Sequence, residues 1–420
     1  MATFAIKQRK SHILLTTVAY AAAVFFKPII MTTTELKRPR VEVADALRGF
    51  AVAAIILLHS IEHFNFYSFP STADQSAWLN FTDRAVWDGM FFMFGGKAYA
   101  IFALLFGFSF YVMYNNQERR GYDFRPRFCW RLVLLFLIGN LNAVFFTGEV
   151  LVLYSLVGFV LPLVCRLSNR VVLWIAALCM IQPVEIVKLI TAMLNPDAPA
   201  PTPLDAQFWP VTMNAQANAS FWEMTKVNLW EGQLASLGWA WENARMFQTA
   251  SLFMIGMVAG RNGWFADTEK NRRLWGCVLA CALVAFFPLY GLSNMLPRFI
   301  ETGSIEKPLL LIITSLHKFA FMLVLVTGIL FAFYSTWMER PLRGLMSYGR
   351  MSLTNYITQS IIGSAIFYNW GFALYDELGI TASICVGAGI LFLQILFCNW
   401  WLRHHTHGPL EWVWRKLTWI

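Results

Sequence analysis

Long apolar runs separated by short polar loops constrain this chain more than any other feature. Each run is near or above the roughly 20 residues that a helix needs to cross the hydrocarbon core of a bilayer. The longest are long enough to tilt or break, and Gly95, Gly96 and Lys97 favour a break in one of them. The sequence thus predicts an all-α, polytopic membrane protein with about ten transmembrane helices. The expected spans are about 46–66, 86–114, 129–146, 149–166, 170–193, 246–262, 273–293, 308–336, 347–369 and 380–402.

The composition excludes an ordinary soluble domain. Of the 420 residues, 58% are hydrophobic and 14% are charged, whereas soluble domains average about 25% charged residues. The net charge of +9 comes from basic residues in short loops between apolar runs. That distribution indicates membrane topology, so we expect the lipid bilayer as a partner and no nucleic acid. A homodimer is an alternative that the sequence leaves open.

The loop charges predict the orientation of the chain. With the tail before Arg48 on the inside, every inside loop carries more Arg and Lys than its outside neighbours. Both termini are therefore expected in the cytoplasm.

Four regions follow from this topology. Residues 1–40 are expected to be an N-terminal extension and leader, with Met31 as the natural start, although an extra membrane anchor is the alternative. Residues 41–193 form the first five-helix half, and residues 246–420 form the second half, which ends in an interfacial helix. Between them, the external loop 194–245 carries spaced tryptophans, which favour helices lying on the outer surface; a substrate-covering cap is the less favoured alternative.

One polar stripe stands out in the first span. Asp45, Arg48, His59, Glu62 and His63 are ionisable groups in an apolar run, and such groups at membrane depth are functional candidates. Arg48 and His59 are eleven residues apart, which places them on one helical face about 16 Å apart along the axis. Glu62 and His63 are expected to continue that face, and Asp45 can pair with Arg48. The alternative is structural: Arg48 reaches the headgroups, and His59 and Glu62 satisfy each other.

A few further polar residues lie in or beside the other spans. Asp88 and Lys97 flank the apolar start of the second span, and we include both among the substrate-binding candidates. Asn355 and Gln359, one turn apart in the ninth span, either bind substrate or form hydrogen bonds between helices. No metal site is expected, because neither a carboxylate nor a cysteine completes the histidine group near the C-terminus. We expect no bound cofactor.

Three stretches together resemble the YeiB family of bacterial inner-membrane proteins. They are Ala44-Asp-Ala-Leu-Arg-Gly-Phe-Ala-Val, Gly349-Arg-Met-Ser-Leu-Thr-Asn-Tyr-Ile-Thr-Gln-Ser360 and Gly408-Pro-Leu-Glu-Trp-Val-Trp-Arg415. The resemblance covers residues 41–420. It implies a multipass protein of the bacterial cytoplasmic (inner) membrane, in a family described as a domain of unknown function.

The family is regarded as distantly related to integral-membrane acyltransferases, which carry an Arg-x10-His motif in their first helix. Arg48 and His59 have that spacing, although Asn often occupies the His59 position in the YeiB family. The resemblance thus implies an acyltransferase that uses acyl-CoA as donor substrate. His59 would be the general base, Glu62 would orient its ring, and Arg48 would contact an anion or the thioester. A transporter or exporter of a small polar or anionic solute, and a non-catalytic membrane scaffold, are the alternatives.

Overall fold

The described residues of the chain fold into helices and connecting loops and contain no strand. The computed structural model describes residues 41–195, 202–300, 303–335 and 339–420. The predicted all-α class is therefore confirmed for these residues. The expectations for residues 1–40, including the start at Met31, lie outside them.

Helices occupy every position at which a span was expected. The first part of the chain contains α2 (Glu42–Ile61), α3 (Ala77–Phe94), α4 (Ala98–Glu118), α5 (Arg125–Ala143), α6 (Val150–Val157), α7 (Val160–Val164), α8 (Asn169–Met180) and α9 (Pro183–Leu194). The segment that follows contains α10 (Phe208–Asn218), α11 (Phe221–Val227), the π-helix η1 (Asn228–Gly232) and α12 (Gln233–Glu242). The last part contains α13 (Arg245–Asn262), α14 (Glu269–Met295), the 3-10 helix η2 (Leu296–Arg298), α15 (Gly303–Phe333), α16 (Glu339–Arg350), α17 (Ser352–Phe367), α18 (Ile380–His404) and α19 (Pro409–Thr418).

Five stretches of the described chain are long and apolar enough to cross a membrane. They are Glu42–Ile61, Ala77–Glu118, Glu269–Arg298, Ser304–Phe333 and Ile380–His404. A sixth forms if α8 and α9, which are bent by 44° at their junction, make one broken span. The membrane character of the chain thus rests on five or six spans, fewer than the ten expected from the sequence. The break expected at Gly95–Lys97 is present, because α3 ends at Phe94 and α4 begins at Ala98.

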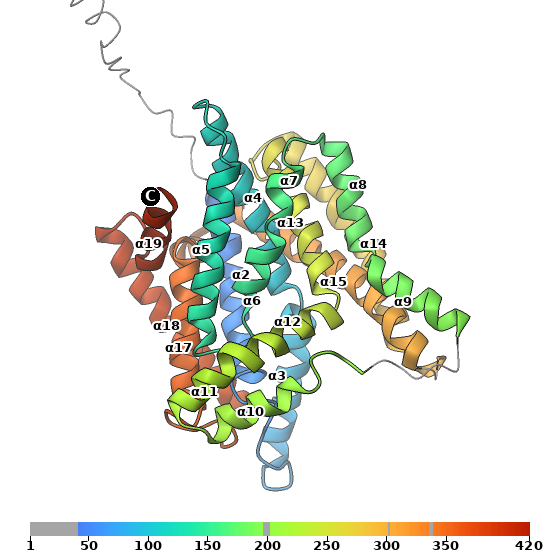
Figure 1. Cartoon of the computed structure of the whole chain (residues 1–420), viewed down its shortest axis with the longest axis vertical. Helices are drawn as coiled ribbons and strands as arrows, with labels where there is room; N and C mark the ends of the chain where they lie inside the picture. Colours follow the sequence, from blue (N-terminus) through green and yellow to red (C-terminus); the bar gives the residue numbers. More distant parts are fainter. Residues whose placement is uncertain (1–40, 196–201, 301–302, 336–338) are drawn as a thin grey trace, which may run out of the picture. The chain divides into compact units, whose positions relative to one another are not determined.

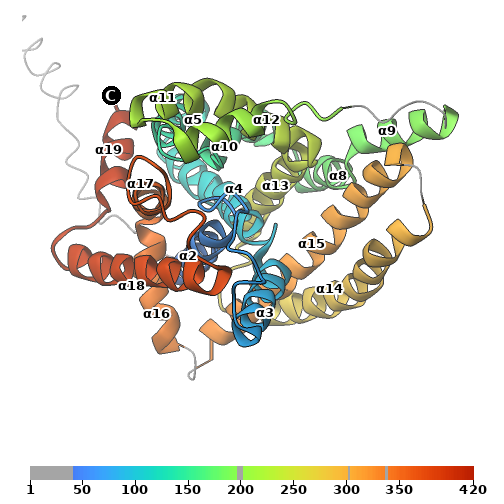
Figure 2. The same ribbon diagram turned by 90° about the horizontal axis from the view of Figure 1, so that it is seen from below.

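Helix α2 is the element around which the others gather. It packs against α3, α4, α15, α16, α17 and α18, and it lies among these helices in both views (Figures 1 and 2). Most of its residues are buried. The polar groups of α2 therefore face protein or an internal cavity, as the sequence predicted.

Helices α4 and α13 approach each other backbone to backbone. A Cβ atom on Gly107 of α4 would lie 1.8 Å from the carbonyl oxygen of Phe253, and one on Gly256 of α13 would lie 1.8 Å from that of Leu104. Small residues permit this close packing between membrane helices. No larger side chain fits at either glycine unless the helices separate.

The C-terminal helix α19 begins at Pro409, as expected, and caps a neighbouring helix. The carboxylate of Glu411 accepts hydrogen bonds from the backbone N–H groups of Leu353 at 2.7 Å and Thr354 at 3.1 Å. These groups lie in the first turn of α17, where N–H groups lack partners within the helix. Glu411 thus joins α19 to α17.

Candidate functional site

A cavity of about 1410 Å³ lies at the carboxyl end of α2. Its walls come from α2, α3, α4, α6, α10, α12, α13, α14, α15 and α17. Because so many helices contribute, the cavity lies inside the helical bundle. Sites in membrane bundles are commonly built from facing helices in this way.

Three cations from three separate places in the chain line the cavity. They are Lys97, at the break between α3 and α4; Arg245, at the start of α13; and Lys318, in the middle of α15. Lys97 and Lys318 lie close enough to Arg245 for their charges to interact. Buried charges are usually paired with an opposite charge. Among the described residues, none of the three cations forms an ion pair with a carboxylate.

The hydrogen-bond partners of two of these cations are neutral. The Nζ atom of Lys97 donates to the carbonyl oxygens of Phe91 at 3.2 Å and Phe92 at 2.7 Å, which caps the carboxyl end of α3. The Nη1 atom of Arg245 donates to the Tyr99 hydroxyl at 2.9 Å and to Oε1 of Gln248 at 3.0 Å. Its guanidinium also lies 4.7 Å from the centre of the Tyr99 ring. These contacts orient Arg245 without neutralising its charge.

A carboxylate–histidine pair faces the same cavity. Oε1 of Glu62 lies 3.0 Å from Nδ1 of His63, and the ring centres of His63 and His59 are 5.0 Å apart. All three residues line the cavity. A carboxylate this close to Nδ1 favours a proton on that nitrogen, which leaves Nε2 available to take a proton. The carboxylate contact therefore lies at His63, whereas the sequence assigned it to His59.

The reason for this difference is local. Helix α2 ends at Ile61, and Glu62 has a non-helical conformation with φ −121° and ψ −59°. The backbone N–H groups of Glu62 and His63 still donate to the carbonyl oxygens of Leu58 and His59, and both side chains line the same cavity as His59.

Arg48 lies at the other end of α2 and is absent from the residues that line the cavity. Its Nη1 atom is 2.5 Å from Oδ1 of Asp45, and its Nη2 atom donates to the Ser109 hydroxyl on α4 at 2.7 Å. The predicted pairing of Asp45 with Arg48 is therefore confirmed. The structure does not bring Arg48 and His59 into one site, because Arg48 contacts Asp45 within α2 and Ser109 on α4 at the opposite end of α2.

Asn355 and Gln359 are buried on α17 and are also absent from the cavity lining. The side chain of Asn355 donates to the backbone carbonyl oxygen of Tyr348 at 2.9 Å, and the backbone carbonyl oxygen of Asn355 accepts from the Gln394 side chain of α18 at 3.1 Å. These contacts favour hydrogen bonding between helices for Asn355. Gln359 lies one turn further along the same helix.

The outer part of the cavity includes Asp88 and the segment that was expected on the outer surface. Asp88 lines the cavity, and its Oδ2 atom lies 3.8 Å from Nε of Arg84, with both side chains exposed. Trp209 of α10 and Trp239 of α12 also line the cavity. Helices α10 and α12 thus form part of its wall.

Sequence reasoning missed the convergence of Arg245 and Lys318. In the sequence, Arg245 directly precedes an apolar run and Lys318 lies within one, and this placement is the available signal. Cations in such places are uncommon and point to a specific role.

Gly96 lies close to both Lys318 and Arg245, and this contact allows the cations to lie near each other. Gly96 has a φ of +74°, and a Cβ atom there would lie 2.8 Å from Cδ of Lys318 and 3.1 Å from Nη2 of Arg245. Glycine meets both requirements, the left-handed backbone and the absence of a side chain. Chemically, the cavity brings the three cations close to the Glu62–His63 pair, while Asp88, Glu149 and Asp205 place further carboxyl groups on its wall. It can bind an anion and move a proton beside it.

Comparisons with known proteins show a similarity to proteins of unknown function. Residues 259–420 match the family model described as "Protein of unknown function (DUF418)". The chain is 26% identical to the uncharacterized protein YxaH of Bacillus subtilis, over 92% of this chain and 96% of that protein. It is also 26% identical to the uncharacterized protein YeiB of Escherichia coli, over 89% of this chain and 95% of that protein. These matches support the resemblance of the chain to YeiB-like proteins of unknown function.

Proposed function

We propose that this protein is a membrane acyltransferase that holds an anionic substrate in the cavity beside Lys318 and Arg245. One observation carries the proposal: these cations face the same cavity as the Glu62–His63 pair, and no described carboxylate forms an ion pair with them. An uncompensated cation inside a membrane protein is unfavourable unless a ligand or water solvates it. An anion bound there would stabilise both charges.

The proposed topology has ten spans, both termini in the cytoplasm, and the bacterial inner membrane as location. Its support is the basic character of the loops at the end of the bundle opposite the cavity, together with helices at all ten expected positions. In this orientation the cavity faces the outer side. The acceptor then enters from outside, and a cytoplasmic donor must reach the cavity through the helical bundle.

The proposed reaction uses His63 as general base. The acceptor oxygen attacks the carbonyl carbon of an acyl-CoA thioester while His63 takes the hydroxyl proton. The carbon–sulfur bond then breaks, and the leaving coenzyme A thiolate takes up that proton. Glu62 stabilises the protonated ring through its contact with Nδ1. The phosphates of coenzyme A supply an anion that suits Arg245 and Lys318.

A second candidate is a transporter of a small anionic solute. The break between α3 and α4 at Lys97 and the 44° bend between α8 and α9 favour it. Broken helices beside a central binding site are typical of transporters. The same cations would then line the path of the solute.

Purified protein, supplied with radioactive acetyl-CoA, tests the first candidate. His63→Ala and Glu62→Gln should each lower acetyl turnover by about a hundredfold or more, which is the usual contribution of a general base. Lys318→Gln should raise the KM for acetyl-CoA, whereas Lys307→Gln, on the exposed start of the same helix, should leave it unchanged. Normal turnover in folded His63→Ala protein would refute the enzyme proposal. Anion uptake into vesicles that depends on Lys318, without acetyl turnover, would favour the transporter.

A further inference from the structure

A second cavity, of about 510 Å³, lies at the end of α4 that is remote from the first cavity. It is enclosed by the carboxyl end of α4, the loop that follows, the start of α5 and the end of α19. Its charged lining residues are Arg120, Arg127, Arg415 and Asp123, and Trp419 lies beside them. The described residues thus contribute three guanidinium groups and one carboxylate to this cavity.

Helix α19 is fixed in place to form one wall. The guanidinium of Arg131 lies 3.4 Å from the centre of the Trp414 ring. Trp130 donates through Nε1 to the carbonyl oxygen of Leu417 at 3.0 Å, and Arg131 donates to the Thr418 hydroxyl at 3.2 Å. These contacts between α5 and α19 define the cavity, because they hold the end of α19 beside the start of α5.

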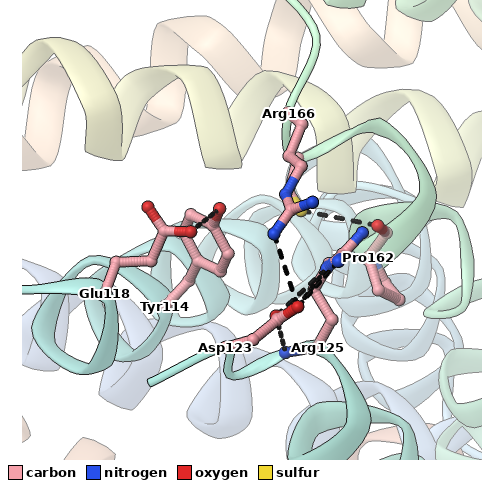
Figure 3. A network of polar contacts seen from close by, with 7 residues as sticks. Tyr114, Glu118, Asp123, Arg125, Pro162 and Arg166 are labelled. Carbon is pink, nitrogen blue, oxygen red and sulfur yellow. Dashed lines mark hydrogen bonds and ion pairs between the residues drawn. The ribbon is translucent and has the colours of Figure 1, made fainter. Parts of the chain in front are cut away.

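The single carboxylate of the cavity is already neutralised. Asp123 accepts from Nη2 of Arg125 at 2.6 Å and from Nη2 of Arg166 at 3.4 Å, as Figure 3 shows. The hydrogen bonds from Arg125 lower the pKa of Asp123 to about 2. Asp123 therefore remains ionised but paired. Among the described residues, no carboxylate forms an ion pair with Arg127 or Arg415.

Two of these arginines keep donors for a ligand. Arg127 donates to the carbonyl oxygen of Thr418 at 3.4 Å, and Nη1 of Arg415 lies 2.6 Å from Nε2 of His407. Both contacts involve only Nη1, and a guanidinium has five N–H donors. Arginine binds phosphate through paired donors of this kind.

The position of the cavity matches the headgroup level of a membrane. Helix α4 has 21 residues between Lys97 in the first cavity and Arg119 beside the second. Such a helix is about 30 Å long, close to the hydrocarbon thickness of a bilayer. The side chains of Trp130, Trp412 and Trp419 are about half exposed around the second cavity. Tryptophans gather at the membrane–water interface.

We propose that the second cavity binds the phosphodiester headgroup of an anionic phospholipid. Arg120, Arg127 and Arg415 bind the phosphate, and Trp419 lies against the glycerol and the start of the acyl chains. Basic pockets at the cytoplasmic face of membrane helices are suited to such headgroups. A lipid fits better than a soluble phosphate because exposed aromatic side chains surround the site.

The test measures lipid retention by native mass spectrometry of the full-length protein in neutral detergent. Phosphatidylglycerol should remain bound, whereas phosphatidylcholine at the same concentration should not. The triple variant Arg120→Gln, Arg127→Gln, Arg415→Gln should retain phosphatidylglycerol at least about tenfold more weakly. Asp123→Asn, which removes the negative charge and still permits a side-chain cap at α5, should strengthen retention.

A matched control carries the same change in net charge. It combines Arg170→Gln, Arg273→Gln and Arg403→Gln, whose side chains are exposed outside the cavity, and it should retain phosphatidylglycerol normally. Equal loss in this control would overturn the proposal, as would equal retention of phosphatidylcholine. Displacement of the lipid by an equal concentration of inorganic phosphate would assign the cavity to a soluble anion instead. If the triple variant does not fold, each single variant should show a partial loss, and full retention in all three contradicts the proposal.

Discussion

The backbone of Gly96 lies directly against the side chain of Lys318: a Cβ atom on Gly96 would be 2.8 Å from Cδ of that lysine. The contact joins the break after α3 to the middle of α15, which are more than 200 residues apart in the chain. Both parts line the cavity. The position of the Lys318 ammonium thus depends on a residue without a side chain.

Gly96→Ala should therefore weaken anion binding and destabilise the fold. The left-handed backbone at Gly96 costs an alanine about 1 kcal/mol, and displacement of Lys318 adds to this value. Thermal unfolding and acetyl-CoA binding measure the two effects. Gly276→Ala on α14, where a Cβ atom would meet nothing within 4 Å, is the control and should change neither. Unaltered binding in the Gly96 variant would show that Lys318 does not contact the ligand.

Arg48→Gln should destabilise the protein and leave ligand binding in the cavity intact. The substitution removes an ion-pair partner from Asp45, which is 2% exposed, and breaking a buried pair costs on the order of 3 kcal/mol. The double variant Asp45→Asn, Arg48→Gln should recover part of this loss. Thermal unfolding of the three proteins gives the coupling between the residues. A stable Arg48→Gln protein that no longer binds acetyl-CoA would place Arg48 in the site after all.

Glu411→Ala should release the C-terminal helix. The change removes the acceptor for two N–H groups at the start of α17, and losing a helix cap costs about 1 kcal/mol. Limited proteolysis should then cut near Gly408 before the rest of the protein unfolds. Glu411→Gln keeps one acceptor oxygen and should protect the site better than alanine. Equal protection of all three proteins would show that Glu411 does not hold α19.

The stability of the protein should also depend on pH through Glu411. Burial raises the pKa of Glu411, although hydrogen bonds from Thr354 oppose the shift. A carboxyl group whose pKa rises on folding stabilises the folded state fully below its unfolded pKa. This contribution is lost as the pH rises through the folded pKa. The unfolding temperature should thus increase toward acid pH, and this increase should be smaller in the Glu411→Gln protein. The same dependence of unfolding temperature on pH in both proteins would contradict this account.

A cytoplasmic C-terminus is the central prediction of the proposed topology. Alkaline phosphatase fused after Trp419 should be inactive, because the enzyme works only outside the cytoplasm, whereas a fluorescent reporter there should be active. A fusion after Leu194, at the end of α9, should give the opposite result. Phosphatase activity after Trp419 would reverse the orientation of every loop and place the second cavity outside.

The sequence predicted the helices well because their signals are local. Apolar length, the glycines before Lys97, and the one-turn spacing of Asp45 and Arg48 each act within a few residues. The site was predicted less well. Spacing indicates the helical face on which Arg48 lies, but not the depth at which neighbouring helices leave a cavity. The spacing argument also required α2 to continue through His63, whereas the helix ends at Ile61.

Arg245 and Lys318 show the other limit of sequence reasoning. They come together through the packing of α13 and α15 around α4, and no short motif records that arrangement. Each residue alone resembles a charge at a helix end or a lone polar group in an apolar run. Only the cavity that Arg245 and Lys318 share distinguishes them from such ordinary charged residues.

The glycine contact between α4 and α13 decides which walls of the first cavity can move. Gly107 and Gly256 bring the two backbones together, so neither helix can slide past the other without a clash. Lys97 immediately precedes one of these helices, and Arg245 begins the other. The part of the cavity wall that carries Lys97 and Arg245 is therefore fixed. To admit a bulky ligand or release a product, the opposite part of the wall must shift, which is the hairpin of α14 and α15 that carries Lys318.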